Sequence, residues 1–103
     1  MKLAIRLNPA DNVAVAMEDL GAGEHLSVLS ERGVEVDRVV VMAPVAPLYH
    51  KVALAQVDPG AAVIKYGETI GYATAPIRRG DWVHMHNLIS PSAAELERSG
   101  GAR

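Results

Sequence analysis

Hydrophobic and polar positions in this chain alternate with a period of two residues over several short stretches. This alternation is typical of half-buried β-strands, in which successive side chains point to opposite faces of the sheet. In the first such stretch, residues 2–7, Leu3, Ile5 and Leu7 occupy alternate positions. Further strands are predicted at Val13–Met17, around Leu26 and Val28, and at Val34–Met42, with a hairpin-type turn at Ser30–Gly33 before the last of these. The pattern predicts an all-β (mainly β) protein of short strands.

Two prolines interrupt the longest apolar run. Ala43–Pro47 contains Pro44 and Pro47, whose φ is fixed and whose nitrogens carry no hydrogen to donate. We therefore expect an extended connector or an edge strand here, not a central strand.

An internal repeat consists of an apolar residue, two others, glycine, two others and a second apolar residue. It occurs as Leu20, Gly23 and Leu26, as Val57, Gly60 and Val63, and as Ile77, Gly80 and Val83. The spacing predicts a tight turn in which glycine takes positive φ, followed by a returning strand, with both apolar residues in the core. A structural role for these glycines is the favoured interpretation.

The run Gly80–Asn87 has the sharpest pattern. In a strand, Trp82, His84 and His86 share one face, and Val83 and Met85 share the other. We therefore predict that the apolar pair faces inward. The indole and the two imidazoles would then face a substrate, a partner or solvent together.

The two histidines of this run are candidate metal ligands and candidate catalytic residues. Imidazoles two residues apart in a strand can approach one metal ion, and histidine offers a neutral nitrogen at neutral pH. Two ligands do not complete a site, so others would come from His50, Glu68, Asp81 or another chain. The alternative is that His84 and His86 form an exposed pair that only makes hydrogen bonds.

His50 and Lys51 begin the segment after the proline-rich connector. A histidine beside a lysine can bind or protonate a substrate that carries a carboxylate. The alternative is two surface residues at the start of a strand.

Lys65–Glu68 lies between two strand-like runs and is predicted to be a hairpin turn, because Gly67 can take positive φ. This explains the glycine and leaves Lys65 and Tyr66 as candidate substrate contacts. The alternative for Tyr66 is a half-buried packing residue whose hydroxyl reaches water.

Composition narrows the classes of function. The 103 residues are half hydrophobic, which suits one domain, and the formal charge of −2 disfavours nucleic acid and anionic membranes as partners. The absence of cysteine excludes disulfides and thiolate metal sites, and the first residues do not resemble a signal peptide. We expect a soluble, cytoplasmic protein.

The end of the chain changes character. Residues 1–89 are predicted to form the domain, and residues 90–103 a tail. Ser92–Glu95 matches a capping box, which predicts one or two helical turns through Arg98. Ser99–Arg103 is expected to fray.

Five motifs, taken in order, resemble the amino-terminal domain of the altronate and galactarate dehydratase family. They are Asp11–Ala16, His50–Leu54, Val63–Gly67, Ile70–Ala73 and His84–Asn87. Their ordered co-occurrence over residues 3–89 is more specific than any one of them. The resemblance implies a small SAF-type domain with a β-clip fold.

The resemblance also implies a chemistry. Members of this family remove water from sugar acids such as altronate or galactarate with a divalent metal, usually iron or manganese. Some relatives are split into two chains, among them the sulfolactate sulfo-lyases, whose small subunit is similar to this chain. The positions implied to contact metal or substrate are His50, Lys51, Lys65–Gly67, His84, His86 and Asn87.

The large domain of the fused members is missing from this sequence. The hypothesis is therefore a small subunit of a two-chain carbon–oxygen or carbon–sulfur lyase, inactive alone and acting with a large catalytic subunit. His50, His84 and His86 would be catalytic, with Lys51, Lys65, Tyr66, Trp82 and Asn87 binding substrate. One alternative is a stand-alone module that binds a sugar or sugar acid, and another is a structural or regulatory subunit; a homo-oligomer is compatible with each.

Overall fold

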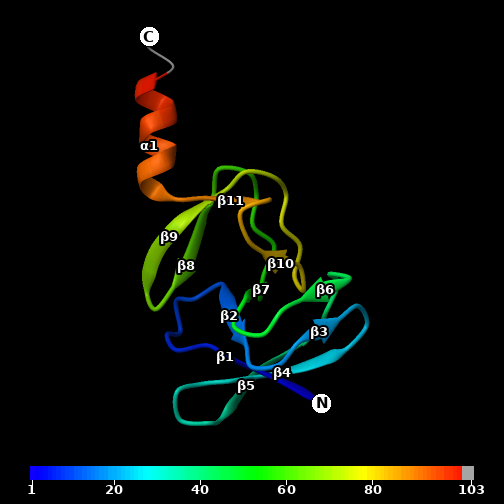
Figure 1. Cartoon of the computed structure of the whole chain (residues 1–103). Helices are drawn as coiled ribbons and strands as arrows, with labels where there is room; N and C mark the ends of the chain where they lie inside the picture. Colours follow the sequence, from blue (N-terminus) through cyan, green and yellow to red (C-terminus); the bar gives the residue numbers. More distant parts are fainter. Residues whose placement is uncertain (101–103) are drawn as a thin grey trace.

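The computed structural model describes residues 1–100, with side chains described up to Arg98. The described elements are eleven short strands and one helix (Figure 1). In chain order they are β1 (Lys2–Ile5), β2 (Val13–Ala16), β3 (Leu20–Gly21), β4 (His25–Leu29), β5 (Glu35–Val40), β6 (Val45–Ala46), β7 (Lys51–Ala53), β8 (Ala62–Lys65), β9 (Glu68–Ala73), β10 (Trp82–Val83), β11 (Leu88–Ile89) and α1 (Pro91–Gly100). The predicted all-β class is confirmed.

The strands form three sheets. Six of them make a sheet in the order β10-β7-β2-β1-β4-β5, in which β1 and β4 are parallel and the other neighbours antiparallel. A second sheet has the order β11-β9-β8, and β3 pairs with β6 in a third. The pairing of β6 confirms that the proline-rich connector forms an edge strand, and the β4–β5 hairpin is also as predicted.

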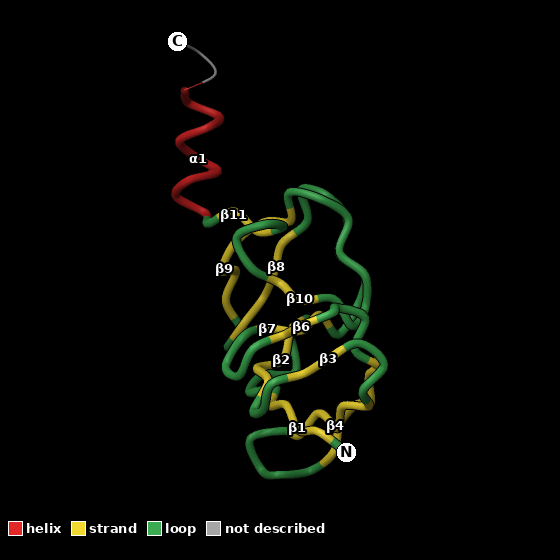
Figure 2. The backbone as a smooth tube through the Cα atoms, turned by 45° about the vertical axis from the view of Figure 1, so that its right-hand side comes forward, coloured by secondary structure: helices red, strands yellow, loops and turns green. Residues whose placement is uncertain are grey.

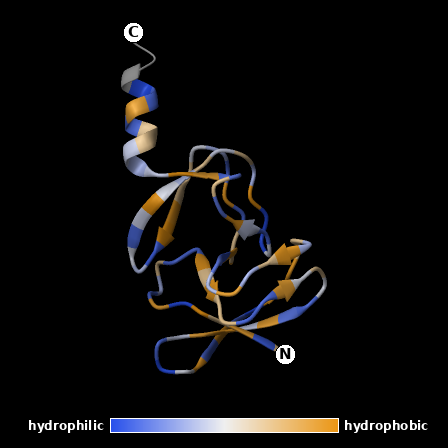
Figure 3. Ribbon diagram, in the orientation of Figure 1, coloured by the Kyte–Doolittle hydropathy of each residue, from blue (hydrophilic) through white to orange (hydrophobic). Residues whose placement is uncertain are grey.

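Each face of the six-stranded sheet contributes to one of two hydrophobic cores. Small residues of β1 and β2 pack with Leu26, Val28 and Val52 in the first core. The second core joins the large sheet to the β8–β9 hairpin through Val13, Val63 and Val83. Figure 3 shows apolar residues along β2 and β8, which contact each other where the two sheets meet.

The apolar side of β1 is not the side that packs in a core. Ala4 is fully buried, whereas Leu3 and Leu7 remain partly exposed. The β8–β9 hairpin covers the large sheet only at the Val13 end of β2, so the bulky side chains of β1 have no layer above them.

The three repeat glycines adopt the predicted conformation, with φ of 84° at Gly23, 86° at Gly60 and 93° at Gly80. Each is the third residue of a turn closed by a hydrogen bond between the first carbonyl and the fourth amide. All six flanking apolar residues are buried. The returning strands do not pair with the strands before the turns, however: β4 pairs with β1 and β5 instead of β3. The flanking residues therefore divide between two cores, with Leu20 and Leu26 in the first.

The helix begins earlier and runs further than predicted. Ser90, not Ser92, is the N-cap: its hydroxyl accepts from the Ala93 amide at 3.2 Å, and Pro91 takes the first helical position. The helix reaches Gly100, and residues 101–103 of the predicted frayed end lie outside the described residues. In Figures 1 and 2, α1 projects from the end of the molecule where β9 and β11 lie. No described helix has the length and apolar character that crossing a membrane requires.

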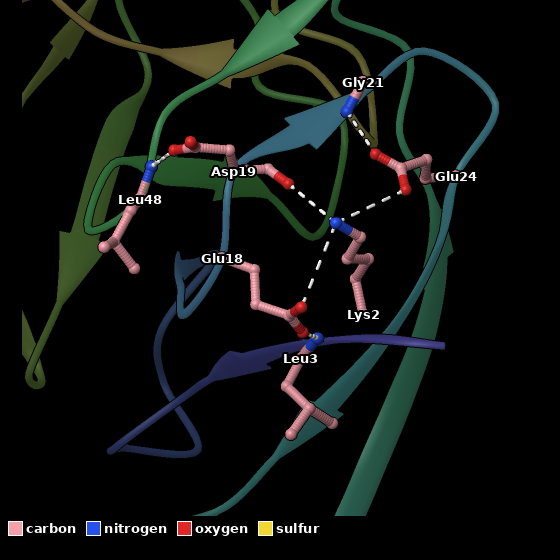
Figure 4. Close-up of polar contacts among 7 residues, drawn as sticks. All are labelled: Lys2, Leu3, Glu18, Asp19, Gly21, Glu24 and Leu48. Carbon is pink, nitrogen blue, oxygen red and sulfur yellow. Dashed lines mark hydrogen bonds and ion pairs between the residues drawn. The ribbon is translucent and has the colours of Figure 1, made fainter.

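A polar network fixes the connection between β2 and β3 (Figure 4). The Lys2 ammonium donates to the Asp19 carbonyl at 3.2 Å and lies within 4 Å of the Glu18 and Glu24 carboxylates. The Asp19 carboxylate in turn accepts from the amide of Leu48 at 2.7 Å. The network thus ties β1 to the loop that leads into β7.

Candidate functional site

Four rings gather where β7 begins and β10 ends. The centroid of the His84 ring lies 5.0 Å from that of His50 and 5.3 Å from that of Trp82, with which it stacks at an interplanar angle of 9°. The centroid of the Trp82 ring also lies 5.6 Å from that of His50 and 5.3 Å from that of His86. The structure therefore brings together His50, Trp82, His84 and His86, here called the ring cluster.

The sheet register places the tryptophan of this cluster. Trp82 pairs with Val52, and Val52 pairs with Ala14, so these side chains share the face that packs in the first core. Trp82 packs against that core. Its indole N–H is buried and has no acceptor among the described residues, so packing and not a hydrogen bond holds the ring.

The predicted strand through Asn87 is wrong beyond Val83. β10 ends there, and residues 84–87 form a turn closed by a hydrogen bond from the Asn87 amide to the His84 carbonyl. Met85 is 81% exposed and does not face inward. The rings still meet, because the turn, not strand alternation, returns His86 toward Trp82.

Asn87 builds this turn. Its side chain is 7% exposed; Oδ1 accepts from the His84 amide, and Nδ2 donates to the Trp82 carbonyl, both at 2.9 Å. Both polar ends of the side chain are therefore bound to backbone. Its predicted contact with substrate stays a prediction, whereas its positioning of His84 is observed.

The environment of His84 favours a neutral imidazole. Burial lowers the pKa of His84 below its ordinary value, and positive charge on His50, Lys51 and His86 lowers it further. His50 Nδ1 lies 3.3 Å from the Leu48 carbonyl, which suits the tautomer with the proton on Nδ1 and an acceptor at Nε2. A neutral His84 can accept a proton.

A hollow of about 310 Å³ opens beside Trp82 and His86. This is near the lower size of pockets that hold small molecules. Its walls combine apolar and charged side chains: Met42, Ala43, Pro44, Ala75, Pro76, Arg78, Asp81, Trp82, His86 and Asn87. Asp81, a suggested further metal ligand, instead accepts from the Arg78 amide at 2.8 Å and pairs with the Arg78 guanidinium.

The donor set of this chain does not fit a metal ion by itself. Among the described residues, no three His, Cys, Asp or Glu side chains lie close enough to hold one. His84 and His86 as ligands of iron or manganese therefore stay a prediction that requires donors from elsewhere.

The other predicted substrate contacts lie on the opposite face of the large sheet. Lys51 pairs with Val83 and Val15, whereas Trp82 pairs with the next residue, Val52. The side chains of Lys51 and Trp82 therefore point to opposite faces of the sheet. Burial lowers the pKa of Lys51, and the positive charge of Lys65 adds to this effect. Lys65 Nζ lies 4.7 Å from the centroid of the Tyr66 ring. Lys51, Lys65 and Tyr66 thus form a second group, although the charge of Lys51 still reaches His84.

Two positioning residues were not singled out from the sequence. Asp11 is buried, and its carboxylate accepts from the amides of Tyr66 at 3.0 Å and Gly67 at 2.8 Å. Asn12 binds Ile64 and Ala62 of β8 through its side chain. The signal available was an Asp-Asn pair in a turn, a place where such side chains commonly bind backbone.

Comparison with known protein families gives a match to a domain sequence model. Residues 2–91 match the model described as the altronate/galactarate dehydratase SAF domain. The match therefore includes every element except most of α1.

Three curated proteins are similar to this chain. It is 42% identical over 83 residues to altronate dehydratase of Escherichia coli K12, covering 81% of this chain and 15% of that protein. It is 32% identical over 92 residues to galactarate dehydratase (L-threo-forming) of the same strain, covering 89% of this chain and 16% of that protein. Altronate dehydratase of Bacillus subtilis 168 is 32% identical to it over 87 residues, covering 84% of this chain and 16% of that protein. The chain spans 15–16% of the length of these relatives.

Proposed function

Because this chain belongs to the altronate/galactarate dehydratase SAF domain family, we propose that it is the small subunit of a lyase that dehydrates a sugar acid. The main catalytic groups would come from a large partner chain. The observation that carries the proposal is the ring cluster, which sets a neutral His84 against His50 and Trp82 near an open hollow.

Dehydration beside a carboxylate requires a base for the α-proton, stabilisation of the enediolate and an acid for the departing hydroxyl. His84 and His50 supply imidazoles that can accept a proton or return one. Trp82 supplies an apolar face against which the carbon chain of a sugar acid can pack. His86 completes the wall on the side of the hollow.

Stabilisation of the enediolate is assigned to the partner in this proposal. No metal-binding group of three donors occurs in the described residues, so the divalent metal of the proposal, iron or manganese, would be held mainly by the partner. That metal would supply positive charge to the developing enediolate. Lys51, Lys65 and Tyr66 remain predicted substrate contacts, and the ring cluster is the part of this chain to which the proposal gives a catalytic role.

The test is reconstitution with the large catalytic chain. We expect the purified chain to be inactive on altronate and galactarate, and the mixture to release the 2-keto-3-deoxy acid. In the mixture, His84→Ala should lower kcat by about 10²-fold or more, since this is the usual contribution of a positioned acid or base. Met85→Ala is the matched control, because Met85 is exposed in the same turn.

The outcomes separate the two halves of the proposal. Turnover by the isolated chain would show that the two-chain arrangement is wrong. Full activity of the His84→Ala mixture would show that the ring cluster has no catalytic role. Sulfolactate in the same assay distinguishes a carbon–sulfur from a carbon–oxygen lyase.

A second candidate function is a module that binds a sugar acid without transforming it. The hollow beside Trp82 favours it, since a tryptophan face and polar side chains suit carbohydrate. Isothermal titration of the chain alone with galactarate is the test. Binding that Trp82→Ala removes, with no turnover in the reconstituted mixture, would favour the module over the lyase.

A further inference from the structure

An apolar groove lies on the open part of the large sheet, on the face opposite the ring cluster. Its floor is formed by bulky side chains of β1, β2 and the residues that follow them, and a tyrosine comes from each of two loops. The residues are Ile5, Leu7, Val15, Met17, Tyr49 and Tyr66. Tyr49 is 68% exposed and Tyr66 53% exposed, so both rings stand above the floor.

The two tyrosines share an unusual backbone. Tyr49 has a φ of 68° and Tyr66 a φ of 58°, and they are the only non-glycine residues of the described chain with positive φ. This conformation is unfavourable for a residue with a bulky side chain. Both of these strained positions line the same groove, which is the kind of clustering seen at ligand-binding sites.

Tyr66 is a poor residue for its turn. It precedes Gly67 in the two-residue β8–β9 loop, and both have positive φ, as a type I′ turn requires. The favoured first residue there is asparagine, which tolerates this backbone. The turn by itself therefore does not explain a tyrosine at this position.

Hydrogen bonds hold both tyrosines in place. The Asp11 carboxylate binds the amides of Tyr66 and Gly67. The Tyr49 amide donates to the Ala16 carbonyl at 2.7 Å, and the preceding Leu48 amide donates to Asp19 (Figure 4). The backbone that carries both rings is thus held by hydrogen bonds, which reduces the ordering cost of binding.

Two lysines neighbour residues that line the groove. Lys51 neighbours Val15 across the sheet, and Lys65 places its ammonium over the Tyr66 ring. The positive charge of Lys65 lowers the pKa of Lys51 in addition to the larger effect of burial, and neither lysine has an ion-pair partner among the described residues. An anionic group between them would relieve the repulsion between the two positive charges.

We propose that this groove docks a segment of a partner polypeptide in which an aliphatic or aromatic side chain is flanked by carboxylates. The apolar side chain lies on Ile5 and Val15 between the two tyrosines, and the carboxylates face Lys51 and Lys65. Docking here leaves the ring cluster on the other face free. The proposal assigns Lys51, Lys65 and Tyr66 to the partner segment in place of the substrate contacts predicted for them, and it does not depend on the reaction that the ring cluster serves.

The test uses the full chain labelled with ¹⁵N and two pools of capped hexapeptides. In one pool Leu or Phe is flanked by Asp and Glu, and in the other each acid is replaced by Lys. We expect only the acidic pool to shift the amide signals of Tyr49, Lys51 and Tyr66, with binding weakened by salt. The Lys51→Gln/Lys65→Gln double variant should lower affinity about tenfold or more, since it removes both charges.

Tyr66→Asn separates binding from folding. It places the favoured residue in the turn, so the melting temperature should stay the same or rise, while peptide binding is lost. Arg78→Gln is the charge control, because it removes a positive charge from the wall of the hollow and should leave peptide binding unchanged.

Three results would overturn the proposal. One is that the acidic and basic pools shift the groove amide signals equally, or that neither pool shifts them. Another is a shift of the groove amides by galactarate, which would make the groove a small-molecule site. The third is a concentration-dependent shift of these amides without peptide, together with a dimer in light scattering, which would make a second copy of the chain the occupant.

Discussion

Single buried side chains decide how the exposed functional residues are presented. Asn87 joins the Trp82 carbonyl to the His84 amide and so shapes the turn that carries both histidines of the predicted pair. Asp11 does the same for the β8–β9 turn, where it fixes the backbone of Tyr66. In both cases the residue that positions the group is less exposed than the group itself.

Replacing Asn87 by alanine should lower the free energy of unfolding by about 1–3 kcal/mol, because it leaves the buried ends of two hydrogen bonds without partners. Chemical denaturation of the purified chain measures this. Met85→Ala, in the same turn but exposed, should change stability by less than about 0.5 kcal/mol. Equal effects of the two substitutions would show that Asn87 does not hold the turn.

The lowered pKa of His84 gives a prediction with a defined sign. Titration followed by NMR should place the pKa of His84 below the ordinary histidine value, because the folded state disfavours its protonated form. The unfolded chain then binds more protons as the pH falls below that ordinary value, so stability falls over the same range. Well above the ordinary histidine pKa, His84 is neutral in both the folded and the unfolded chain, and it no longer makes stability depend on pH.

His50→Gln should raise the pKa of His84 in part, since it removes a neighbouring positive charge but not the effect of burial. Met85→Ala should leave the pKa unchanged. An unshifted His84 in the wild-type chain would contradict the proposed neutral imidazole at the site.

At the scale of elements, the three glycine turns are alike in backbone but not in surroundings. A Cβ at Gly23 or Gly60 would meet open space, whereas one at Gly80 would lie 2.3 Å from the Val40 carbonyl oxygen. Gly80 thus lets the turn before β10 approach the strand β5, and the Gly80 carbonyl accepts from the Met42 amide at 2.9 Å. The ring cluster depends on this approach, because β10 begins with Trp82, two residues after Gly80.

Gly23→Ala should cost about 1–2 kcal/mol, the usual effect of left-handed backbone for a residue with a Cβ. Gly80→Ala should cost clearly more, because the clash with backbone is added to the same backbone strain. Thermal unfolding of the two variants gives the comparison. Equal costs would show that the turn at Gly80 does not approach β5 as closely as described.

The whole molecule consists of two cores that share the six-stranded sheet, with α1 outside both. Among the described helix residues, Ala94 is the one that is buried. The domain boundary predicted at residue 89 therefore has a direct test. A chain ending at Ser90 should still unfold cooperatively, with a loss of about 1 kcal/mol for the burial of one small side chain.

Circular dichroism during heating measures this change. Retention of the sheet signal and a melting temperature lowered by a few degrees is the expected result. Loss of cooperative unfolding would show that α1 is part of the domain and that the boundary lies elsewhere.

Local pattern alone determined the features that depend on neighbouring residues. Alternation gave the strand class, the glycine spacing gave three turns with positive φ, and the prolines limited residues 43–47 to an edge. Five ordered motifs were enough to indicate the family, which the domain match shows. These features are local because backbone conformation and side-chain alternation act over a few residues.

Tertiary structure alone decided which faces are covered and which side chains meet. Alternation could not show that Ala4 is buried while Leu3 and Leu7 remain open, because that depends on where the β8–β9 hairpin lies. The same is true of His50, which meets Trp82 and His84 only because β7 lies beside β10. Contacts between strands distant in the chain are set by sheet order and register, and periodicity within one strand carries no information about either.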